Sequence, residues 1–244
     1  MTAKHLLILW CVIAPVLDGQ NNRSPRKTGG LTGPDQIHPT MILWNTGLVE
    51  TITPASLEGR KTWRITHYPQ DPVESTTNDY DLYDLDRFTF VPLRSVMNNE
   101  NSHLELLFAE KEVIFRKTQG KETSTEQIPL SGPVEPEGPG LDLFVARLPL
   151  AVGYKKHYAI VDRWGSHGST RVKAMTLSVS NQFQKNSAMG RLAVYEVLIR
   201  PDDGSFQIRE QVFARGPHFP VRVEYTREGK TYPASEVIAF ADAL

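Results

Sequence analysis

The densest cluster of acidic side chains in the sequence lies between residues 79 and 86. Four aspartates alternate there with tyrosines and leucines, namely Asp79, Asp81, Asp84 and Asp86. Calcium takes roughly six to eight oxygen ligands, and four neighbouring carboxylates could supply several of them. However, the glycine of an EF-hand loop is missing, and an extended chain would place Asp81 and Asp84 on opposite faces. We therefore interpret the stretch as the charged, solvated start of a strand, which also discourages edge pairing, and keep calcium as the alternative.

A second stretch that invites a chemical interpretation is Gly165-Ser166-His167-Gly168-Ser169, which places hydroxyls beside an imidazole. A nucleophile elbow requires Gly-x-Ser-x-Gly between a strand and a helix. The spacing here differs and both flanking segments have the pattern of strands, so the segment is predicted to be a hairpin loop. Elsewhere in the sequence, no nucleophile, base and orienting group occur at a spacing that would let them act together in catalysis. We therefore do not expect an enzyme.

The sequence contains no recognisable metal or cofactor motif. The seven histidines are scattered, and no two have the i, i+2 or i, i+4 spacing that builds a metal site on one element. We expect each to lie on the surface or to be a hydrogen-bonded core residue, although His103, His157 and His218 could converge through long-range folding. Cys11 is the only cysteine. Neither a metal nor a cofactor is predicted.

Large apolar side chains recur at positions that could line a cavity for an apolar ligand. Ordinary core packing explains the same pattern, because aromatic residues dominate protein cores as well. The candidate ligand-binding residues are Phe88, Phe90, Leu104, Leu106, Phe108, Phe115, Tyr195, Phe206 and Phe213.

Strands must position these residues, because apolar and polar side chains alternate through most of the chain. In the first half, the alternation predicts strands at 60–68, 86–93 and 103–108. The strand at 86–93 would place Phe88 and Phe90 on one face. A further strand at Val113 and Phe115 follows a turn at 109–112, which predicts a hairpin.

The second half begins after a Pro- and Gly-rich segment at 131–140, which is predicted to be a loop between two halves of one β-rich domain. A short helix is expected at 141–148, ended by Pro149. Strands follow at 157–161, 170–180, 192–200, 205–213, 221–225 and 237–240. Asp203-Gly204 predicts a two-residue hairpin turn in which both residues tolerate positive φ, and a slip in the alternation between Ala174 and Met175 suggests a bulge.

The N-terminal segment has the composition of a secretory signal peptide. Residues 6–17 form an apolar run after Lys4, too short to span a bilayer, and cleavage after Gly19 would leave Gln20 first. Cleavage would also remove Cys11, which is compatible with an oxidising periplasm. Residues 20–39 are rich in polar residues, Gly and Pro and are predicted to be a flexible linker, so the β-rich domain would span 40–244.

Charge excludes one class of partner. The 27 basic and 28 acidic residues give a net charge of −1, so no overall field attracts nucleic acid. The basic pairs Lys155-Lys156 and Arg171 with Lys173 lie among acidic residues and predict a solvated face.

Two groups of residues carry a resemblance to known proteins. The segments 142–150 (DLFVARLPL), 157–161 (HYAIV) and 217–222 (PHFPVR) resemble a family of uncharacterised exported bacterial proteins. The segment 86–95 (DRFTFVPLRS), with the hairpin after it, resembles that family and the periplasmic lipoprotein carriers. The resemblance spans about residues 45 to 240 and implies a curved, half-open antiparallel sheet whose concave face can hold an acyl chain.

The sequence is compatible with three functions. The leading hypothesis is a periplasmic or secreted protein that binds a lipid or another apolar ligand in the concave face of a mainly β, half-open barrel. An alternative is a structural or interaction module that binds a cell-envelope protein through a strand edge. An enzyme ranks last. Contact with a membrane surface fits the first two hypotheses, whereas a membrane-spanning protein does not.

Overall fold

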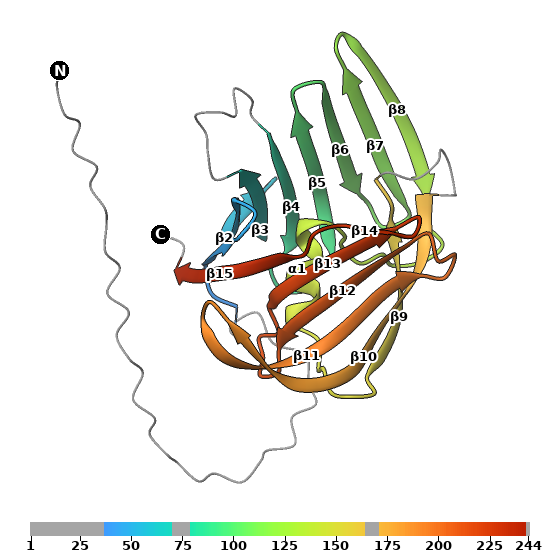
Figure 1. Cartoon of the computed structure of the whole chain (residues 1–244). Coiled ribbons are helices and arrows are strands. Elements are labelled where there is room, and N and C mark those ends of the chain that lie inside the picture. The colour runs from blue at the N-terminus through green and yellow to red at the C-terminus, as the bar shows by residue number, and fades with distance from the viewer. Residues whose placement is uncertain (1–36, 70–78, 164–170, 243–244) are drawn as a thin grey trace, which may run out of the picture.

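One long antiparallel sheet runs through almost the whole chain and curves around a short helix (Figure 1). The computed structural model describes residues 37–69, 79–163 and 171–242. The strands are β1 (Thr40–Trp44), β2 (Leu48–Leu57), β3 (Arg60–Pro69), β4 (Tyr80–Asp86), β5 (Pro92–Asn99), β6 (Ser102–Phe108), β7 (Glu112–Gln119), β8 (Glu122–Pro129), β9 (Lys155–Val161), β10 (Val172–Ser187), β11 (Gly190–Pro201), β12 (Phe206–Phe213), β13 (Pro220–Arg227), β14 (Lys230–Thr231) and β15 (Ser235–Asp242).

Two meanders build the sheet, and the last strand joins them. Strands β1 to β8 pair in sequence order, as do β9 to β13, while β15 pairs with β1 on one side and with β13 on the other. Strands β8 and β9 therefore lie at the two ends of the order. Within the described residues no ladder closes one end onto the other, so the expected mainly β, half-open curved sheet with one short helix is confirmed.

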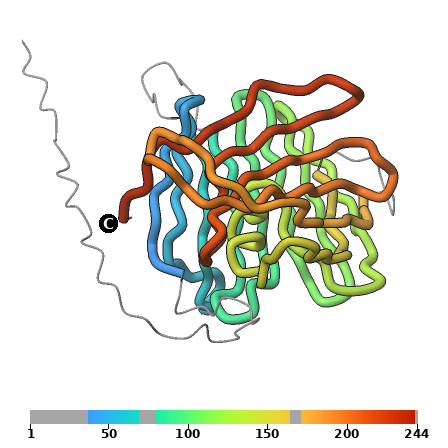
Figure 2. The backbone as a smooth tube through the Cα atoms, turned by 60° about the horizontal axis from the view of Figure 1, so that its bottom comes forward, coloured from blue at the N-terminus to red at the C-terminus, as the bar shows by residue number. Residues whose placement is uncertain are grey.

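The helix α1 (Pro139–Ala146) lies inside the curve, between β4–β5 and the strands β12–β13 that cross in front of it (Figures 1 and 2). All eight of its residues are buried, as expected for a helix that is apolar on nearly every side. Leu143 packs with Ile52, Trp63 and Ile65, whereas Phe144 packs with the C-terminal strands. The helix thus fills much of the concave space that the sequence assigned to a ligand.

The helix begins and ends two residues earlier than predicted. Pro139 starts it, because proline at the first helical position loses no intrahelical hydrogen bond. Leu148 precedes Pro149, which disfavours helical backbone, and α1 ends at Ala146. The predicted 131–140 loop therefore contributes its last two residues to the helix.

The strands predicted at 60–68, 103–108 and after the 109–112 turn are confirmed as β3, β6 and β7. The strand predicted at 86–93 is wrong. Asp86 ends β4, and its carboxylate accepts hydrogen bonds from the backbone N–H groups of Phe88 and Thr89, which forms a turn. Phe90 then adopts a positive φ of 61°, and β5 begins at Pro92.

In the second half all six predicted strands are present, as β9 to β13 and β15. The predicted bulge is displaced, because the register shift in the β10–β11 pair lies between Val179 and Asn181. In the turn between β11 and β12 only Gly204 has a positive φ, so the expectation of two such residues is wrong. Asp203 instead accepts a hydrogen bond from the Ser205 amide.

The predicted signal peptide and most of the predicted linker lie outside the described residues. Ile37, within the predicted linker, is 3% exposed and belongs to the core with Ile42 and Trp44. Its burial places the start of the packed β structure before residue 40. No helix in the described ranges is long and apolar enough to cross a bilayer.

Candidate functional site

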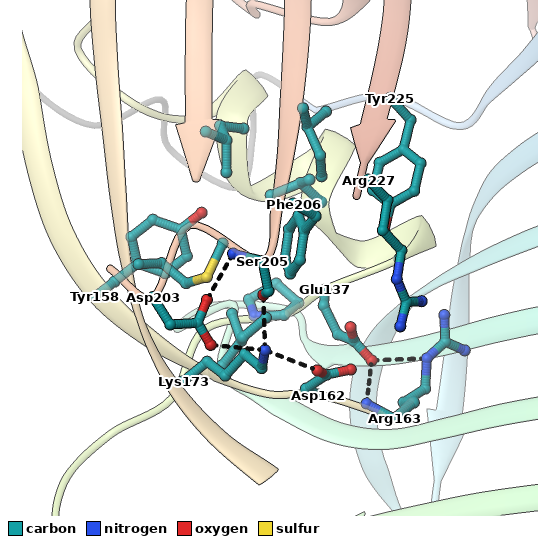
Figure 3. A pocket seen from close by; sticks show the side chains of 17 residues that line it. Glu137, Tyr158, Asp162, Arg163, Lys173, Asp203, Ser205, Phe206, Tyr225 and Arg227 are labelled. Atoms are coloured by element: carbon teal, nitrogen blue, oxygen red, sulfur yellow. Dashed lines mark hydrogen bonds and ion pairs between the residues drawn. The ribbon is translucent and has the colours of Figure 1, made fainter. Parts of the chain in front are cut away.

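A pocket of about 430 Å³ opens between α1 and strands β9 to β13 (Figure 3). Its volume falls in the range of roughly 300–1,000 Å³ typical of ligand sites. The apolar side chains of the floor come from one helix and four strands, and they are Leu141, Ile160, Met175, Ile199, Phe206 and Ile208. Tyr158 and Tyr225 add aromatic rings to the walls.

Charged side chains gather on one side of this apolar floor. They are Glu137, Asp162, Arg163, Lys173, Asp203 and Arg227, three acidic and three basic. The pocket therefore combines an apolar interior with a polar rim whose formal charges cancel. Such a site suits a molecule with an apolar body and a polar end.

Lys173 lies at the centre of one rim network, which Figure 3 shows as dashed lines. Its Nζ donates to Asp203 Oδ2 at 3.0 Å and to Ser205 Oγ at 2.9 Å, and it lies 3.5 Å from Asp162 Oδ2. The Ser205 amide and side chain, followed by Lys173, lower the pKa of Asp203 to about 2. A lysine and a serine in contact resemble the Ser-Lys pairs of some hydrolases. Here two carboxylates surround an ammonium that already donates to the serine, so it is not placed to accept the serine proton.

Arg163 organises a second network on the opposite side of the rim. Its Nε donates to Glu137 Oε1 at 2.7 Å, and its terminal nitrogens bind both carboxylate oxygens of Asp81. The Arg163 side chain is only 4% exposed, so the guanidinium relies on these carboxyl oxygens as hydrogen-bond acceptors in place of water. Burial raises the pKa of Glu137 to about 7, although Arg163 acts in the opposite direction.

This network corrects two predictions from the sequence. The segment 79–86 is not a solvated start of a strand, because β4 is an interior strand of the sheet, paired with β3 and β5. Asp84 is completely buried between Arg64 and Arg94, on the face opposite Asp81. Asp84 is thus paired with two arginines, and the described residues of this segment form no carboxylate group that would bind calcium.

The basic pair Arg171 and Lys173 was predicted to lie on a solvated face, and this is wrong for Arg171. The Arg171 residue is 4% exposed, stacks over the Phe115 ring at 4.0 Å and donates from Nε to Glu126 at 3.0 Å. The Gly165–Ser169 segment lies outside the described residues.

Of the nine candidate ligand-binding residues, the structure places Phe206 in the pocket. Phe88 is 63% exposed at the β4–β5 turn, so its predicted inward position is wrong. The others pack elsewhere in the molecule. Phe90, Leu104, Leu106 and Phe115 are buried core residues, Tyr195 contacts the His218 ring, and Phe108 and Phe213 line two other pockets of about 530 and 580 Å³, respectively.

Sequence reasoning missed most of the pocket because its floor is made of isoleucine, methionine and leucine side chains that alternate like any strand core. Its polar rim comes from the ends of β9, β10 and β12 and from the loop before α1. The Pro- and Gly-rich composition of 131–140 marked that loop, yet nothing in it indicated that Glu137 faces a pocket.

A separate group of polar side chains is buried beneath α1. Glu50 on β2, His67 on β3 and Asp142 on α1 each bring one potential ligand atom to within 4.8 Å of the others. His67 Nε2 lies 2.9 Å from Glu50 Oε2. The three histidines whose convergence the sequence left open have separate partners, since His103, His157 and His218 bond Asn98, Thr176 and the Phe213 carbonyl, respectively.

Comparisons with known proteins leave the family open. No protein-family model and no curated protein matches the chain. A solved structure of a β-barrel-like protein of domain of unknown function DUF1849 from Brucella abortus is similar, with 10% identity and a TM-score of 0.40. The similarity covers 79% of this chain and 80% of that protein. The resemblance to the lipoprotein carriers stays a prediction.

Proposed function

We propose that the protein binds a small amphipathic molecule, such as an acyl chain with a polar end, in the pocket between α1 and β9–β13. The observation that carries the proposal is the combination of an apolar floor and a charge-balanced rim in one volume of about 430 Å³. Removing apolar ligand surface from water against Leu141, Ile199 and Ile208 would provide affinity, at about 25 cal/mol per Å². The rim would then hold the polar end.

Because the Lys173 and Arg163 side chains are already paired with carboxylates, a full anionic head group would have to displace an existing partner. A neutral or zwitterionic end would instead add hydrogen bonds to the rim without breaking its ion pairs. The proposal therefore favours ligands without net charge at their polar end.

The alternative of partner binding through a strand edge has weaker support. The outer edge of β9 is already used, because the Glu135 amide donates to the Ala159 carbonyl at 2.7 Å. At the other end of the sheet, β8 is mostly exposed and carries Glu122, Glu126 and Pro129, which discourage pairing with another strand.

Export remains part of the proposal and rests on the N-terminal apolar run and the spacer that follows it. The protein would then act in the periplasm or outside the cell. N-terminal sequencing of the protein recovered from its native cells should give Gln20 as the first residue. An N-terminus at Met1 or Thr2 would contradict export by cleavage.

The binding proposal is tested by filling the pocket. Ile208→Trp adds bulk at a partly buried floor residue of β12, and Ile114→Trp on β7 is a matched control at a partly buried strand position away from the pocket. With a fluorescent acyl-chain probe, we expect one site per chain in the wild type and in Ile114→Trp, and binding weaker by about tenfold or more in Ile208→Trp, which corresponds to about 1.4 kcal/mol. Equal binding by all three proteins, or no binding by the wild type, would reject the pocket.

A further inference from the structure

The carboxyl groups of Glu50, Asp142 and Glu210 are buried together in the interior, at 0%, 7% and 1% exposure. They come from β2, α1 and β12, far apart in the sequence. Glu210 raises the pKa of Glu50, Glu50 raises the pKa of Asp142, and Asp142 raises the pKa of Glu210. Three carboxyl groups thus share one low-dielectric region beneath the helix.

Among the described residues, no arginine forms an ion pair with Glu50, Asp142 or Glu210, in contrast to the buried carboxylate of Asp84. Asp84 has Arg64 and Arg94, whereas the side chains that contact Glu50 are the imidazole of His67, the carboxyl group of Asp142 and the indole of Trp44. The neutral form of an imidazole can ligate a metal. The cluster therefore needs protons or a bound cation to offset its negative charge.

Polar atoms without hydrogen-bond partners point to the same need. Glu50 Oε1 and Glu210 Oε2 are buried and have no hydrogen-bond partner within the described part of the chain. Leaving such atoms unsatisfied costs about 1–3 kcal/mol each. Glu50 and Asp142 hydrogen-bond each other, which requires a proton on one of them, and a cation between them would take the place of that proton.

We propose that Glu50, His67 and Asp142 form a binding site for one divalent transition-metal ion of the zinc class. One imidazole nitrogen and two carboxylate oxygens are a donor set that zinc accepts, with about 2.0–2.2 Å to each ligand. Tetrahedral ligands at that distance lie roughly 3.4 Å apart. The atoms here are separated by 2.9 Å for the closest pair and by no more than 4.8 Å, so small side-chain rotations suffice. Calcium, which takes roughly six to eight oxygens, does not fit.

The site is independent of the proposed ligand pocket. Leu141 lines that pocket, while the next residue, Asp142, points to the acidic cluster. Metal entry has a route, because the His67 side chain is 21% exposed. A bound ion would connect β2 and β3 to α1 and hold the helix against the N-terminal half of the sheet.

Zinc binding to the purified, chelator-treated chain tests the site by isothermal titration calorimetry. We expect one Zn²⁺ per chain and a rise in Tm on saturation. Asp142→Asn and His67→Gln should each bind at least about 100-fold more weakly, since even loss of an outer-shell partner costs 10- to 100-fold. His103→Gln, whose ring bonds Asn98 on a distant hairpin, is the matched control and should bind as the wild type does.

Cobalt provides a readout that does not depend on the folding of the variants. Co²⁺ bound by the wild type should give visible absorption bands that added Zn²⁺ removes. Absence of both Zn²⁺ and Co²⁺ binding by the wild type would overturn the proposal and leave a proton shared between Glu50 and Asp142. Unchanged affinity in folded Asp142→Asn and His67→Gln would overturn it equally. Because the pocket residues are unaltered in these variants, acyl-probe binding reports separately on the proposed function.

Discussion

At the scale of single residues, the main feature of this protein is the burial of charged side chains. Arg163, Arg171 and Asp84 are each buried in networks that provide opposite charge or carbonyl oxygens. Replacing one partner of such a pair leaves an uncompensated charge and destabilises by about 3–5 kcal/mol. Glu137 differs, because burial outweighs its contact with Arg163 and its carboxyl resists ionisation.

Glu137→Gln should therefore change the pH dependence of stability. The pKa of Glu137 is raised from 4.5 to about 7, so its stabilising effect is complete below about pH 4.5 and is lost as the pH rises through 7. Over that window the wild type should lose about 3 kcal/mol more unfolding free energy than the glutamine variant, which cannot ionise. Urea unfolding at pH 5 and pH 8 measures the difference. Glu105→Gln removes a surface ion pair with Arg116 and is the control, so its unfolding free energy should change with pH as that of the wild type does. An equal loss of unfolding free energy in Glu137→Gln and the wild type would refute the raised pKa of Glu137.

At the scale of elements, α1 determines what the curved sheet can hold. An eight-residue helix is too short to be stable alone, so packing against both halves of the sheet must stabilise it. The close approach of its first turn to β4 and to the preceding loop requires glycine. A Cβ on Gly140 would lie 2.6 Å from Pro136 Cβ and 3.1 Å from the Tyr83 ring.

Gly140→Ala should destabilise the protein, although alanine is the better helix former by about 1 kcal/mol. The added methyl group meets a rigid proline and a buried ring, and overpacking of this kind costs about 1–3 kcal/mol. Gly132→Ala is the control, because no atom lies within 4 Å of its added Cβ, and it should be neutral or slightly stabilising. Denaturant midpoints with unchanged m-values measure both. A stabilised Gly140→Ala protein would show that the helix can shift away from β4.

At the scale of the whole molecule, the question is what keeps a sheet with two free ends curved. Val161 on β9 packs among apolar side chains of β6 to β8. Arg171, which precedes β10, reaches across to Glu126 on β8 and Phe115 on β7, and also donates to the Arg163 carbonyl. Side chains thus hold the ends together where backbone hydrogen bonds do not.

Arg171→Met should loosen the two ends without unfolding the centre of the sheet. Charge-assisted hydrogen bonds contribute about 1.5–3 kcal/mol, so amide hydrogen exchange in β8 and β9 should accelerate about tenfold or more, while β2 and β3 exchange as before. Arg209→Met removes an exposed pair with Glu196 at 3.8 Å and should leave exchange unchanged. Uniform acceleration through all strands would mean that the sheet opens only as a unit.

Most of the strands could be predicted from the sequence because alternation is local. A period of two places Leu104 and Leu106 on one buried face whatever the rest of the chain does. The same local logic failed at Phe88, where the carboxylate of Asp86 captures two backbone amides and turns the chain. Such hydrogen bonds from a side chain to the backbone compete with strand pairing, and the alternation of apolar and polar residues does not reveal them.

The sequence by itself determined the fold class, the position of the helix to within two residues, and the polar composition of the turns between strands. These features follow from the period of the apolar residues and from backbone chemistry. Only the tertiary structure decided which residues meet. Tyr80–Asp86 form an interior strand in which Asp84 pairs with arginines on β3 and β5, while Asp81 pairs with Arg163, two residues after β9. Glu50, His67 and Asp142 carry no shared motif, and they converge because the sheet curves around α1 and brings its interior side chains together.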